Sequence, residues 1–193
     1  MKNYLLTAIG SLIVLCSPGQ LLKKNVLNSP TAFADSLNKI VNDYPNNFKN
    51  IQGVLLPQEI DADAYQSVAG LPGASNCIIK RYHSLVDNSA SWQAVLYNGD
   101  NFDAASKAYK SIFTQVKKTN IKTTGNHIAS FAGELQPAEE NMRFAVSSLR
   151  LKATDEVFAQ FAADIELVGN YDGWQVHLNI YRKKKDTEGG NLE

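Results

Sequence analysis

Cys77 and His83 lie six residues apart in the segment SNCIIKRYHS and are the side-chain types of a thiol nucleophile and its base. A base must lie within about 3 Å of the proton that it removes. If the segment is a strand, its rise of about 3.3 Å per residue places the two side chains on one face but about 20 Å apart. The pair therefore cannot form a dyad, and either residue would need a partner from a neighbouring strand.

A second candidate group lies on two predicted strands near the C-terminus, at 157–168 and 174–182. Alternation along the last strand predicts that four side chains point away from the core: Gln175, His177, Asn179 and Tyr181. On the preceding strand, Phe161, Ile165 and Leu167 would face the core, leaving Asp164 and Glu166 outside within reach of His177. A histidine with two carboxylates can bind a divalent metal or act in acid-base catalysis. The alternative is a solvated sheet face on which charged cross-strand pairs keep the domain soluble.

Well-marked catalytic and metal motifs are absent from the sequence. It has no Walker-type phosphate loop, G-x-S-x-G elbow, H-E-x-x-H, paired C-x-x-C or EF-hand loop. The group around His177 supplies a single histidine, whereas a metal site needs three or four converging ligands. We expect no metal and no cofactor.

Aromatic side chains suggest a contact surface on the open side of the sheet. Alternation predicts that four tyrosines project there, where they could contact a ligand or a protein: Tyr82, Tyr97, Tyr171 and Tyr181. Four other aromatic side chains are expected in the core: Trp92, Trp174, Phe144 and Phe161.

Two helices are predicted to support these strands. Ser29 and Pro30 can start a helix whose apolar residues recur at three- and four-residue spacing until Pro45 ends it. A second helix is predicted over 100–118, capped by Asp100 or Asn101 and ending with two lysines that suit the helix dipole.

The remaining chain predicts strands separated by turn-forming residues. Beyond the two strands above, the candidates are 48–56, 64–70, 77–84, 92–98 and 143–152, with a brief strand around 127–131. The segment 57–64 is acidic and predicts a loop, and Asp172-Gly173 predicts a type I′ hairpin turn. The fold class that follows is α+β, with a single mostly antiparallel sheet of about five to seven strands and two helices packed on one face.

The first nineteen residues resemble a secretion signal. Lys2 precedes an apolar run that is shorter than the ~20 residues of a membrane span, and small residues follow. We therefore expect a signal peptide over 1–19, a single α+β domain over 20–185 and a disordered tail over 186–193. A lipoprotein anchored through Cys16 is the alternative, although Leu15 stands where the lipobox requires a small residue.

Charge and composition limit the classes of partner. The 193-residue chain has 19 basic and 19 acidic side chains and a pI near 6.8, whereas nucleic-acid-binding domains usually have a pI above about 9. We expect no nucleic acid partner, and membrane association only if Cys16 is lipidated.

Two hypotheses for function follow. The first is a secreted or periplasmic non-catalytic binding module that holds an unknown small ligand or protein on the open sheet face. The alternative is a metal-dependent or other hydrolase with a site around His177, Asp164 and Glu166, or with Cys77 and a histidine from another strand.

Overall fold

The computed structural model describes residues 30–57, 62–83, 89–123, 125 and 127–183. The predicted signal peptide, Cys16 and the predicted disordered tail lie outside the described residues. The architecture is α+β, with one antiparallel sheet and two α-helices, α1 (Pro30–Asp43) and α2 (Phe102–Lys118).

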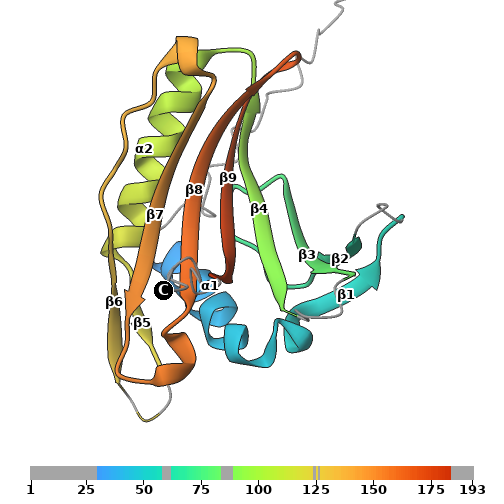
Figure 1. The fold of residues 1–193 in the computed structure, drawn as a ribbon, viewed down its shortest axis with the longest axis vertical. Helices are drawn as coiled ribbons and strands as arrows, with labels where there is room; N and C mark the ends of the chain where they lie inside the picture. The colour runs from blue at the N-terminus through green and yellow to red at the C-terminus, as the bar shows by residue number, and fades with distance from the viewer. Residues whose placement is uncertain (1–29, 58–61, 84–88, 124, 126, 184–193) are drawn as a thin grey trace, which may run out of the picture.

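The sheet has nine strands, more than the sequence predicted, in the order β1-β2-β3-β4-β9-β8-β7-β6-β5. The strands are β1 (Gln52–Leu55), β2 (Ala62–Ser67), β3 (Asn76–Tyr82), β4 (Ala90–Gly99), β5 (Asn120–Lys122), β6 (Ile128–Ala132), β7 (Phe144–Lys152), β8 (Phe161–Asn170) and β9 (Gly173–Arg182). Each half of the sheet is a run of sequential strands, and the two halves meet where β4 pairs with β9. The last strand of the chain therefore lies at the centre of the sheet (Figure 1).

The strand count was underestimated because several segments are short or irregular. β5 has only three residues and follows the second helix directly, so it carries no detectable alternation. β2 begins at Ala62, inside the acidic segment predicted to be a loop. Residues 156–158 form a 3₁₀ helix, so β8 starts later than predicted.

The two helices begin and end close to the predicted positions. The side chain of Asn101 accepts a hydrogen bond from the Ala104 amide at 2.8 Å, which caps α2. At the last residue of α1, the buried carboxylate of Asp43 accepts hydrogen bonds from the backbone amides of Asn50 and Ile51. These contacts fix the connection from α1 to β1.

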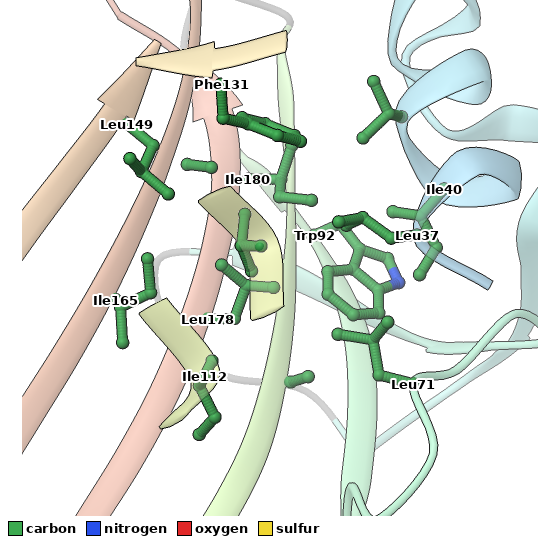
Figure 2. Close-up of a cluster of buried hydrophobic side chains, with 14 of the residues drawn as sticks. Leu37, Ile40, Leu71, Trp92, Ile112, Phe131, Leu149, Ile165, Leu178 and Ile180 are labelled. Carbon is green, nitrogen blue, oxygen red and sulfur yellow. The ribbon is translucent and has the colours of Figure 1, made fainter. Parts of the chain in front are cut away.

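Both helices contribute to one hydrophobic cluster with one face of the sheet. α2 contacts β4, β6, β8 and β9 and therefore lies across this face, while Figure 1 shows α1 toward one end of the strands. Leu37 and Ile40 of α1 lie near Trp92 of β4, while Ile112 of α2 lies on the side of Leu178 and Ile165 (Figure 2). Trp92 is fully buried, and its indole N–H donates to the Ser67 hydroxyl at 3.0 Å. The core therefore covers the sheet face on which the odd-numbered residues of β8 and the even-numbered residues of β9 lie.

The hairpin between β8 and β9 forms as predicted, but its turn is shifted. Asn170 pairs with Gly173, so Tyr171 and Asp172 occupy the turn. Gly173 has a φ of 126°, and a Cβ there would lie 2.5 Å from the Gly99 carbonyl oxygen. The predicted type I′ turn at Asp172-Gly173 is wrong because positive φ occurs at Gly173 and not at Asp172.

Candidate functional site

Six predicted site residues lie on the sheet face opposite the helices, which we call the open face. Strand register places Asp164 directly opposite Asn179 and Glu166 directly opposite His177, on adjacent strands β8 and β9. Tyr181 and Gln175 lie on the same face of β9: Tyr181 is two residues after Asn179, and Gln175 is two residues before His177.

Tyr181 and Asp164 form the best-defined polar contact of this face. The Tyr181 hydroxyl donates to Oδ2 of Asp164 at 2.7 Å. Asp164 is only 8% exposed, and its other oxygen, Oδ1, has no hydrogen-bond partner among the described residues. Burial, together with the hydrogen bond to Asp164 and its charge, raises the pKa of the Tyr181 phenol to about 12.

Asn179 and Glu166 extend this polar group along the two strands. Burial raises the pKa of Glu166; a hydrogen bond from the Asn179 side chain opposes that shift, and the charge of Asp164 adds to it. Oδ1 of Asn179 is buried and, within the part of the chain that the structure describes, accepts no hydrogen bond. Two neighbouring residues therefore each present an unsatisfied acceptor oxygen, and such a group usually costs about 1–3 kcal/mol.

These residues line a pocket with side chains from β3 and β4. The pocket, here called the open-face pocket, has a volume of about 280 Å³ and is lined by Lys80, Tyr82, Ser91, Gln93, Asp164, Glu166, Asn179 and Tyr181. Four of its residues were predicted from β8 and β9, and Tyr82 was predicted as an open-face tyrosine. The sequence prediction missed three lining residues, Lys80, Ser91 and Gln93. Alternation in CIIKRY and SWQA places them on the open face, because the neighbouring Ile79 and Trp92 point into the core.

His177 and Gln175 lie farther along β9 and do not line this pocket. Both imidazole nitrogens of His177 face amide side chains: Nε2 is 3.0 Å from Gln175 Oε1 and Nδ1 is 3.4 Å from Gln93 Nε2. Burial lowers the pKa of His177, and the charge of Lys80 lowers it further. Both of these contacts of the imidazole nitrogens are therefore with uncharged amide groups.

The open face offers no evident metal site. Within the described ranges, no three His, Cys, Asp or Glu side chains are arranged to hold a metal ion. The site that the sequence suggested around His177 contributes a histidine and two carboxylates, but His177 points its nitrogens at amides.

Cys77 and His83 occupy separate environments. Cys77 is a buried free cysteine, and burial raises the pKa of its thiol. Nε2 of His83 lies 3.0 Å from Oδ1 of Asp63. Neither environment activates a nucleophile, because a reactive cysteine needs a lowered thiol pKa and access to solvent.

Three aromatic side chains lie elsewhere than predicted: Tyr97, Phe144 and Tyr171. The register of β4 and β9 shifts between Val95 and Tyr97, which turns Tyr97 toward the core side, where its hydroxyl donates to the Asn101 carbonyl. Phe144 is 52% exposed because the neighbouring Ala145 takes the core position of β7. Tyr171 lies fully exposed in the turn before β9, while Trp92, Trp174 and Phe161 are buried as predicted.

No protein-family model, curated protein or solved structure matches the chain. Among the described helices, none is long and apolar enough to cross a membrane. The geometry of the open face is therefore the basis for the functional argument.

Proposed function

We propose that the protein is a non-catalytic binding module, secreted or periplasmic, that holds a small ligand in the open-face pocket. The observation that carries the proposal is the pair of unsatisfied oxygens, Oδ1 of Asp164 and Oδ1 of Asn179, on a pocket wall. A buried acceptor without a donor destabilises a fold, and a bound ligand that donates to it removes the cost.

The size of the pocket limits the ligand. Its volume of about 280 Å³ lies just below the usual range of about 300–1,000 Å³ for small-molecule sites. A ligand of a single ring, or of comparable bulk, fits this volume.

A thermal-shift panel tests the proposal with named compounds: glucose, galactose, mannose, N-acetylglucosamine, propylammonium chloride, sodium acetate and acetamide. A ligand at hundredfold excess over its Kd stabilises by about 2.7 kcal/mol. At about 2–4 °C per kcal/mol for a domain of this size, Tm should rise by roughly 5–11 °C.

Two serine variants provide a matched comparison. Ser91→Phe fills the open-face pocket, whereas Ser130→Phe adds the same ring to an exposed position of β6, outside the pocket. At least one compound should raise Tm in the wild type and in S130F but not in S91F. An equal rise in all three proteins, or no rise with any compound, would overturn the proposal.

The hydrolase around His177, Asp164 and Glu166 remains the second candidate. One observation favours it: burial raises the pKa of Glu166, which is the direction of shift that a general acid needs. Hydrolysis of chromogenic nitrophenyl esters, phosphates and glycosides separates the candidates. Turnover that disappears in Glu166→Gln and persists in Glu140→Gln, an exposed control, would favour the hydrolase; turnover no faster than buffer supports the binding module.

A further inference from the structure

We infer that the ligand of the open-face pocket is a neutral polyhydroxylated molecule, a single saccharide unit, which donates hydroxyl protons to Asp164 and Asn179. The inference rests on the proposed function and specifies its ligand class. Asp164 anchors it, because this residue is only 8% exposed, lines the pocket and leaves Oδ1 without a described partner.

The polar groups of the pocket include both acceptors and donors. Asp164, Glu166 and Oδ1 of Asn179 can accept hydrogen bonds, whereas the Lys80 ammonium and the Gln93 amide can donate them. A hydroxyl group both donates and accepts, so adjacent hydroxyls on one ring can satisfy both kinds of group. Ligands that only accept would leave the two Oδ1 atoms unsatisfied.

The charges of the pocket disfavour a small ion of either sign. A cation attracted by Asp164 and Glu166 would share the pocket with Lys80, and an anion attracted by Lys80 would meet both carboxylates. Like charges brought close together in a partly desolvated site repel strongly. A neutral ligand avoids both conflicts.

Two tyrosine rings supply the apolar part of the lining. Tyr82 is 56% exposed on β3, and Tyr181 lies two strands away on β9 with its hydroxyl fixed by Asp164. Aromatic rings bury large apolar area and combine it with a polar group at one end. The C–H faces of a sugar ring can pack on such rings while its hydroxyls reach the carboxylate and amide groups.

Saturation-transfer NMR on the full chain tests the ligand class with the seven compounds of the thermal panel. At least one of the four saccharides should bind with a Kd on the order of 1 mM or tighter. Asn179→Leu removes one unsatisfied acceptor and should weaken that saccharide about tenfold or more, whereas Asn141→Leu, at an exposed position outside the pocket, should not change its Kd.

The outcomes separate the two proposals. If propylammonium, acetate or acetamide binds and S91F abolishes that binding while no saccharide binds, the ligand class is wrong and the proposed function stands. If none of the seven compounds binds, both are overturned. If N179L does not fold, S91F takes its place, and saccharide binding that persists in S91F contradicts the inference.

Discussion

Replacing Tyr181 by phenylalanine tests the polar arrangement on which the open-face pocket depends. Among the described residues, the Tyr181 hydroxyl is the only side chain that donates a hydrogen bond to the Asp164 carboxylate, at 2.7 Å from Oδ2. The variant leaves a carboxylate that is 8% exposed without this donor. A hydrogen bond to a charged group contributes about 1.5–3 kcal/mol, and because Tyr181 is only half-buried we expect a loss at the lower end, about 1.5 kcal/mol.

This loss is measurable by urea and thermal unfolding. For a domain of this size, 1.5 kcal/mol corresponds to a decrease in Tm of roughly 3–6 °C. Tyr171→Phe is the matched control, because Tyr171 is fully exposed and its hydroxyl removal should change stability by less than about 0.5 kcal/mol. A double-mutant cycle with Asp164→Ala should give a coupling of about 1 kcal/mol.

The same variant has a signature at alkaline pH. The pKa of Tyr181 is about 12 in the folded state, above the ordinary value near 10. The stability from this shift is present below pH ~10 and is lost as the pH rises toward 12. Burial also raises the pKa of Tyr44 and Tyr109, so these tyrosines also titrate at high pH. The titration of Tyr181 is therefore obtained by subtracting the tyrosinate absorbance of Y181F from that of the wild type at each pH. If Y181F is as stable as Y171F, or if the difference spectrum titrates near pH 10, the reasoning is refuted.

Further predictions concern titratable and buried groups. The pKa of Glu166 is raised because the folded state disfavours its charge. Urea unfolding should therefore show Glu166→Gln to be more stable than wild type near neutral pH, with no difference below pH ~4.5. Glu140→Gln, the control, should be as stable as wild type at both pH values. Because the pKa of His177 is lowered, wild type should lose stability relative to His177→Gln as the pH falls from 7 to 5; equal pH profiles would contradict this expectation. In a Cys16→Ser chain, Cys77 should react with a thiol reagent only after denaturation, and rapid labelling of the folded protein would show that its thiol is accessible.

Much of the open face was predictable because alternation in a strand has a fixed period. From the sequence alone, Asp164 and Glu166 were placed on the face of their strand that points away from Phe161 and Ile165, and the structure places them there. The same rule failed at Tyr97, where a register shift inserts a residue and reverses the faces that follow.

Pairing between distant strands could not be predicted in the same way. Nothing in the sequence indicates that β9 pairs with β4, yet this pairing brings Ser91 and Gln93 next to Tyr181 and Asn179. Alternation identifies which side chains share a face, but cross-strand register decides which of them meet. The structure was therefore required to identify the pocket, whereas the sequence alone had placed its two carboxylates, Asp164 and Glu166, on one face.

The most direct test of ligand binding in the open-face pocket is to map backbone amide shifts in ¹H–¹⁵N spectra as the tightest compound of the panel is added. We predict that the largest shifts lie at pocket residues, in particular Gln93, Asp164 and Asn179, and that S91F removes them. A larger cleft of about 540 Å³ between α1, α2 and β4, lined by residues that include Ser111 and Gln115, provides the competing location. Shifts concentrated at Ser111 and Gln115, with the open face unchanged, would contradict the account.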